Sequence, residues 1–87
     1  MKPKRSESVS WRMVEGEGVL LHLQTGAYYS LNEVGSRVWE LCNGKNSAEQ
    51  IRSTVCAEYP SDPAVVRRDV EQFFARLLKE KLVEFAK

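Results

Sequence analysis

Histidine, the side chain used most often in acid–base catalysis, occurs once among the 87 residues, at His22. The alternation of residues around it predicts a β-strand in which His22 lies on the opposite face from Val19, Leu21 and Leu23. A histidine in such a strand is typically a surface residue. We therefore expect no general base at this position.

The hydroxyl and thiol groups offer no better site. Ser30 and Ser36 have no histidine that the sequence places beside them to activate a nucleophile. Cys42 and Cys56 form no CxxC motif, and a single histidine does not complete a zinc ligand set. Free cysteines are commonly buried, so we expect two reduced, partly buried thiols and no disulfide. The sequence predicts no enzyme, no metal site and no cofactor.

Composition and charge exclude several other classes of function. The 13 basic and 12 acidic residues give a net charge of +1, and 43% of the residues are hydrophobic. A near-neutral chain argues against nucleic-acid binding, which depends on neutralising phosphates. No apolar run approaches the ~20 residues that cross a bilayer, and the basic start has no apolar segment after it to form a secretory signal. We expect one cytoplasmic domain with no membrane contact.

The first half of the chain predicts a small antiparallel sheet. Residues 1–8 are polar and charged and are interpreted as a flexible N-terminal arm, which leaves one domain over residues 9–87. Alternation at 9–14 predicts a strand with Val9, Trp11 and Met13 on its buried face. Strands at 19–23 and 27–31 follow, joined by a short turn at Gly26. Short connections favour the order first, second, third, so the third strand keeps a free side.

The second half of the chain predicts three helices. Asn32 is suited to cap a helix from Glu33 to about Cys42, which Gly44 would end, and Trp39 is expected in its core. Ser47 to Gln50 forms a capping box for a helix that stops near Tyr59. Asp62-Pro63 starts a third helix, expected to run to about Lys81. Its apolar residues at 66, 70, 73, 74, 77 and 78 form one wide arc.

Two ordered motifs carry a resemblance to a known family. The runs LxTGxYYxLNEVGxRVWEL, ending at Leu41, and DVxxFxxxLxxxxLV, from Asp69 to Val83, resemble the signature of PqqD-like proteins. This resemblance, from about Val9 to Phe85, implies an α+β fold like a winged helix-turn-helix, with a three-stranded antiparallel sheet followed by three helices. It also implies binding of the leader segment of a ribosomally made precursor peptide. Lys81 stands where the family usually has glycine, which leaves the end of the third helix open.

A free strand edge beside an apolar groove is the physical requirement for binding an extended peptide. The third strand would offer main-chain groups, and the third helix would form the groove wall and give specificity. Tyr28 would be exposed, whereas Tyr29 and Leu31 would contribute their backbone from the core. The predicted peptide-binding residues are Tyr28, Tyr29, Ser30, Leu31, Val65, Val66, Asp69, Val70, Phe73, Arg76 and Leu77.

The resemblance leaves the pathway and the assembly open. Members of the family present precursors to a leader peptidase and a macrolactam cyclase in lasso-peptide pathways. Others act beside a radical SAM enzyme in pyrroloquinoline quinone biosynthesis. We favour the lasso type for this short chain. A winged-helix DNA-binding protein is the less favoured alternative, because the third helix is mostly apolar. We expect a monomer, although a free strand edge also permits a strand-mediated dimer.

Overall fold

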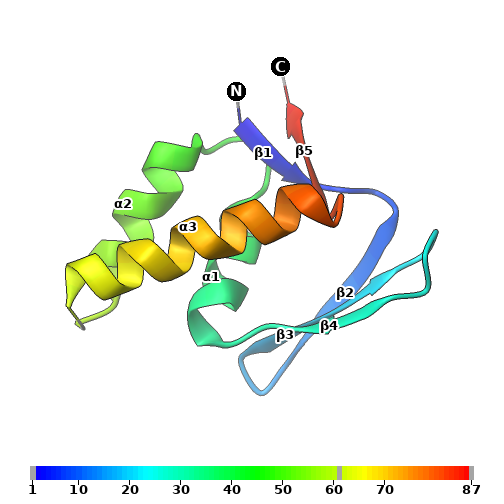
Figure 1. Cartoon of the computed structure of the whole chain (residues 1–87), viewed down its shortest axis with the longest axis horizontal. Coiled ribbons are helices and arrows are strands. Elements are labelled where there is room, and N and C mark those ends of the chain that lie inside the picture. The colour runs from blue at the N-terminus through cyan, green and yellow to red at the C-terminus, as the bar shows by residue number, and fades with distance from the viewer. Residues whose placement is uncertain (1, 61, 87) are drawn as a thin grey trace.

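The computed structural model describes residues 2–60 and 62–86, without the side chain of Ala86 (Figure 1). It has the predicted α+β fold, in which a three-stranded antiparallel sheet precedes three helices that lie to one side of it. The elements in chain order are β1 (Lys2–Arg5), β2 (Val9–Val14), β3 (Glu17–His22), β4 (Tyr28–Ser30), α1 (Glu33–Leu41), α2 (Ala48–Glu58), α3 (Pro63–Lys79) and β5 (Val83–Ala86).

The sheet order β2-β3-β4 is as predicted, but the buried face of β3 is the opposite one. Gly18, Leu20 and His22 are buried, whereas Leu23, just after the strand, is 61% exposed. The apolar pattern could not decide between the faces, because four of the five residues at 19–23 are apolar. The prediction of a surface His22 is therefore wrong: its side chain is 3% exposed, and its Nδ1 accepts a hydrogen bond from the Gln24 amide at 3.2 Å.

The predicted N-terminal arm is a strand over Lys2–Arg5. This strand, β1, pairs antiparallel with β5, so the two ends of the chain lie side by side (Figure 1). Pro3 is fully buried, and the Arg5 guanidinium donates to the carbonyls of Trp39 at 3.0 Å and Glu40 at 2.8 Å. The arm prediction failed because the segment KPKR is polar, and its pairing partner lies about eighty residues away.

Side-chain caps fix the start of each helix, as predicted. The Asn32 side chain accepts from the Gly35 amide at 2.8 Å at the start of α1. Ser47 and Gln50 form a reciprocal capping box on α2, and Asp62 caps α3 with proline in its first turn. These contacts satisfy amides that the first helical turn leaves without partners.

The end of α3 explains how the chain manages without the family's glycine. The helix stops at Lys79, two residues before the predicted end, and Lys81 adopts the left-handed conformation with φ 57°. Such a conformation costs a side-chain-bearing residue about 1–2 kcal/mol. It is held by a hydrogen bond from the Leu82 amide to the Leu77 carbonyl at 2.9 Å, and Leu82 is buried beside it.

The core lies between the inner face of the sheet and the three helices. Trp39 is fully buried, as predicted, and Trp11, which is 38% exposed, packs against it in a T-shaped pair with 6.0 Å between the ring centroids. Leu78, at one end of the wide apolar arc of α3, is 45% exposed. Both cysteines are free thiols, Cys42 buried and Cys56 half-buried. No helix among residues 2–60 and 62–86 is long and apolar enough to cross a membrane.

Candidate functional site

The strand β4 is an edge of its sheet, because β3 is its only strand partner among the residues that the structure describes. The Leu31 amide donates to the Gly18 carbonyl at 2.8 Å, and the His22 amide donates to the Ala27 carbonyl at 2.9 Å. Residues 27 and 31 therefore point their main-chain groups at β3, and by the alternation of an antiparallel ladder residue 29 does so as well. The groups that face away from β3 are those of Tyr28 and Ser30.

This hydrogen-bonding pattern reduces the number of residues whose main chain can pair with a peptide. The prediction assigned the main chain from Tyr28 to Leu31 to a peptide, but only two of these four residues present an amide and a carbonyl to the open edge. They are spaced two residues apart, which is the repeat with which an antiparallel strand exchanges paired hydrogen bonds. The edge can thus accept one short extended segment.

A pocket lies beside this edge, between the start of α1 and one flank of α3. We call it the α1–α3 pocket. Val34, Gly35 and the ring of Phe73 supply its apolar surface. A side chain on Gly35 would place a Cβ 3.3 Å from the Phe73 ring, so glycine permits the close approach of α1 and α3. The lining residues are Asn32, Val34, Gly35, Asp69, Gln72, Phe73 and Arg76.

Tyr29 and Arg76 join β4 to the pocket. The Arg76 guanidinium lies 5.4 Å from the centre of the Tyr29 ring, within the range of a cation–π contact. The Tyr29 hydroxyl donates to the Glu80 carboxylate at 3.2 Å. Burial of the phenol and the neighbouring Glu80 carboxylate raise the pKa of Tyr29 above its ordinary value. These two contacts hold the Tyr29 ring between β4 and the C-terminal end of α3. They therefore fix the distance between the open edge of β4 and the α1–α3 pocket.

Tyr29 links β4 to α3, and Leu31 is buried in the core. The structure places the other predicted site residues as follows. Asp69, Phe73 and Arg76 line the pocket, and Tyr28 and Ser30 form the open edge. A second group, Val66, Val70 and Leu77, is at most 3% exposed and lies in the core, so it offers no surface to a peptide. Val65 is 42% exposed on α3 but does not line the pocket.

Four lining residues escaped the sequence prediction, although the sequence carried signals for them. Asn32, Val34 and Gly35 belong to the first ordered motif, directly after β4. Gln72 lies three residues after Asp69 and four before Arg76, and these spacings bring residues to one face of a helix. Combining the motif with helical spacing would have found all four.

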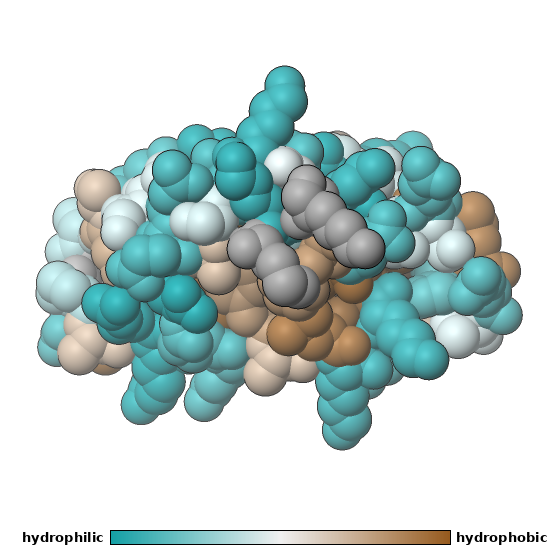
Figure 2. Space-filling model, turned by 90° about the horizontal axis from the view of Figure 1, so that it is seen from above, coloured by the Kyte–Doolittle hydropathy of each residue, from teal (hydrophilic) through white to brown (hydrophobic). Residues whose placement is uncertain are grey.

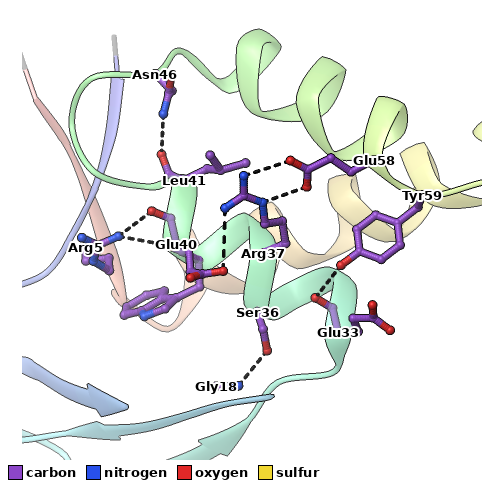
Figure 3. A network of polar contacts seen from close by, with 11 residues as sticks. Arg5, Gly18, Glu33, Ser36, Arg37, Glu40, Leu41, Asn46, Glu58 and Tyr59 are labelled. Carbon is purple, nitrogen blue, oxygen red and sulfur yellow. Dashed lines mark hydrogen bonds and ion pairs between the residues drawn. The ribbon is translucent and has the colours of Figure 1, made fainter. Parts of the chain in front are cut away.

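A polar network on the other side of α1 is structural in character (Figure 3). Arg37 makes a bidentate ion pair with Glu58 at 2.8 and 2.9 Å, which joins α1 to α2 and lowers the pKa of Glu58. The Ser36 hydroxyl accepts from the buried Gly18 amide at 2.7 Å and so joins α1 to β3. These contacts hold α1 in the orientation that forms the α1–α3 pocket.

The described residues contain no group of three or more side chains arranged to hold a metal ion. The family model of PqqD, described as coenzyme PQQ synthesis protein D, matches residues 17–83. The chain therefore belongs to the PqqD family. No curated protein matches the chain.

Solved structures extend this likeness. The protein TbiB1, in complex with the TbiA(beta) leader peptide, is 41% identical with a TM-score of 0.80, and 97% of this chain covers 99% of that one. A lasso peptide synthetase B1 complexed with its leader peptide shares the fold at 17% identity and a TM-score of 0.79, with the same coverage. The PqqD part of Methylobacterium extorquens PqqCD, described as a RiPP recognition element, is 26% identical with a TM-score of 0.69, over 94% of this chain and 87% of that one.

Proposed function

We propose that this chain binds the leader segment of a ribosomally synthesised precursor peptide and presents the precursor to modifying enzymes. The leader would add to the sheet as an antiparallel strand beside β4, with alternate side chains directed at the α1–α3 pocket. The observation that carries this proposal is the open β4 edge next to a pocket that combines the Phe73 ring with polar and charged side chains, in a chain 41% identical to a protein solved with a leader peptide. Main-chain pairing would supply affinity, and the pocket would supply specificity.

The pocket chemistry favours a leader with an apolar side chain next to charged or polar ones. Phe73 and Val34 give a surface for an apolar residue, while Asp69 and Arg76 lie at the rim with opposite charges. A half-buried aromatic ring flanked by charges is typical of an anchor position in peptide recognition.

A binding role without a catalytic step agrees with the surroundings of the one histidine. His22 is buried, and its Nδ1 already accepts the Gln24 amide. The chemistry would then belong to the partner enzymes. We propose a leader peptidase and a macrolactam cyclase as these partners, because the designation B1 is shared by the 41% identical TbiB1 and the lasso peptide synthetase. The alternative is a chaperone role in pyrroloquinoline quinone synthesis, which the description of the family model supports.

The test is an NMR titration of the ¹⁵N-labelled chain with the leader peptide of the precursor whose gene neighbours its own. We expect shifts along β4 and the Asp69–Arg76 flank of α3, slowed amide exchange at Tyr28 and Ser30, and little change in α2. A leader of the same composition in scrambled order is the peptide control.

Phe73→Ala tests the pocket in the same titration. Loss of an aromatic anchor should weaken leader binding by more than about 1 kcal/mol. Val65→Ala is the matched control, because Val65 is an apolar residue of α3 outside the pocket. Shifts confined to α2 and β1, or equal effects of the two substitutions, would contradict the assignment of the groove.

A further inference from the structure

The outer face of the β2-β3-β4 sheet, opposite the core, is apolar and uncovered. Since Gly18, Leu20 and His22 face the core, the alternate residues of each strand face outward. Val14, Leu23 and Tyr28 are 41%, 61% and 73% exposed. We call this surface the outer sheet face; its residues are Ser10, Arg12, Val14, Glu17, Val19, Leu21, Leu23, Tyr28 and Ser30.

In Figure 1 the helices lie to one side of the β2-β3-β4 sheet and leave its other side uncovered. Figure 2, seen from above, shows a mostly hydrophilic surface with a hydrophobic area near the middle and a smaller one at the right-hand end. A shallow hollow in the outer sheet face has Val19 and Leu21 among its lining residues, with Arg12 and Tyr28 beside them.

The outer sheet face ends at the edge where the leader would bind. Register places Ser10, Leu21 and Tyr28 in one row across the three strands, and Arg12, Val19 and Ser30 in the next. A peptide strand added beyond β4 would continue both rows with its own outward side chains. The leader's inward residues would meet the α1–α3 pocket, and its outward residues would become part of the outer sheet face.

Charge argues that the occupant of this face is a protein. Arg12 and Glu17 both lie on it and balance each other, so the face has no excess charge to attract the phosphates of nucleic acid or the headgroups of a membrane. Three exposed apolar side chains around a half-buried centre suit an apolar protein surface instead.

Size argues against a second copy of this chain. Strands of six residues extend about 20 Å, and three strands span about 14 Å, which gives an area of about 300 Å². A stable interface uses about 800 Å² on each partner. The face alone is too small for a stable dimer. A partner that also contacts the bound leader, and the rest of the precursor beyond it, would gain the missing area.

We infer that the outer sheet face is the docking surface for the enzyme that acts on the bound precursor, and that the leader's outward side chains complete this surface. The inference rests on the proposed function. It predicts that the enzyme distinguishes the leader-bound chain from the free chain, because only the bound state presents the extended surface. An empty chain would then not compete for the enzyme.

The test measures two affinities separately, with the leader peptide and the leader peptidase whose genes neighbour that of this chain. The enzyme should bind the chain–leader complex at least about tenfold more tightly than the free chain. The double variant Val14→Ser/Leu23→Ser should weaken enzyme binding at least about tenfold and leave the Kd of the leader within about twofold. Leu78→Ser, at an exposed leucine of α3, should change neither affinity.

The outcomes separate this inference from the proposed function. If the wild-type chain fails to bind the leader, the proposed function fails, and this inference falls with it. If the leader binds but the double variant retains full enzyme affinity, only this inference is overturned. A dimer in analytical ultracentrifugation that the double variant abolishes, with enzyme binding unchanged, would assign the face to a second copy. Should the double variant unfold, Leu23→Glu alone, at the most exposed of these leucines, provides the same test.

Discussion

The two small sheets of this protein use their strand edges in opposite ways. In the β1–β5 sheet, the outer edge of β1 is closed: the Arg5 amide donates to the Cys42 carbonyl, and the Gly44 amide donates to the Pro3 carbonyl, both at 2.9 Å. In the β2-β3-β4 sheet, the edge of β4 is open and flanked by the α1–α3 pocket. An exposed strand edge can pair with strands of other chains, and proteins usually protect such edges. An edge that stays open beside a pocket therefore indicates a binding site.

The closed edge contacts the end of α1 and the core, whereas Tyr29 connects the strand with the open edge to one flank of α3. Arg5 reaches the last carbonyls of α1 and also lies 5.0 Å from the centre of the Trp11 ring, which packs on Trp39. Tyr29 is held by Arg76 and Glu80, at the surface. Substitutions at the closed edge should therefore change stability, and substitutions at the open edge should change binding.

The largest effect is expected at the core beneath the closed edge. Trp39→Ala should lower the free energy of unfolding by about 3–5 kcal/mol, because it removes a fully buried ring and leaves a cavity under Trp11. Urea denaturation followed by circular dichroism measures this. A midpoint close to that of the wild type would show that the ring is not part of the core.

A smaller loss of stability is expected at the closed edge itself. Arg5→Ala removes two hydrogen bonds to α1 carbonyls and the contact with Trp11. Hydrogen bonds to charged groups contribute about 1.5–3 kcal/mol. Because Arg5 is partly exposed, we expect the free energy of unfolding to fall by about 2 kcal/mol. Leader affinity should stay unchanged. Lys4→Ala, at an exposed neighbour in β1, is the matched control for denaturation.

The same contrast explains which parts of the fold the sequence predicted. The caps at Asn32, Ser47 and Asp62 act within a few residues, so local pattern was enough to place the helices. The β1–β5 pairing joins residues about eighty positions apart, and nothing in a polar KPKR segment indicates its partner. The buried face of β3 was misassigned because both faces carry apolar residues, one for the core and one left exposed.

The site was predictable in kind but not in detail. The alternation around Tyr29 indicated a strand, the short connections indicated that this strand lies at an edge, and the wide apolar arc of α3 indicated a groove wall. Helical spacing alone could not tell that Phe73 is half-buried, whereas Val70 and Leu77 are fully buried. The burial of each of these residues depends on where α1 crosses α3. The close approach of Gly35 to the Phe73 ring determines this crossing point.

The stability of the protein should depend on pH through the buried thiol of Cys42, whose carbonyl accepts a hydrogen bond at the closed edge. Burial raises the pKa of Cys42 from 9.0 to about 12. In the unfolded chain the thiol ionises at its ordinary pKa, so its contribution to stability is complete below that value and is lost as the pH rises from about 9 towards 12. At pH 10 the loss should be about 1.4 kcal/mol. Wild type and Cys42→Ala, denatured at pH 7 and pH 10, should differ in pH dependence by this amount. Equal pH dependence in the two proteins would show that the thiol is accessible to water.

The smallest effect tests the open edge without touching a side chain that the fold needs. The Ser30 amide faces away from β3, so Ser30→Pro removes one donor to an added strand and none from the ladder. Loss of one hydrogen bond should weaken leader binding by about 1 kcal/mol, roughly fivefold, with little change in the melting temperature of the free chain. Ser30→Ala keeps the amide and should bind like the wild type, which separates the backbone from the hydroxyl. Isothermal titration of the three proteins with the leader peptide makes the comparison. If Ser30→Pro binds as tightly as Ser30→Ala, the leader does not pair with β4, and the open edge would need another explanation than peptide addition.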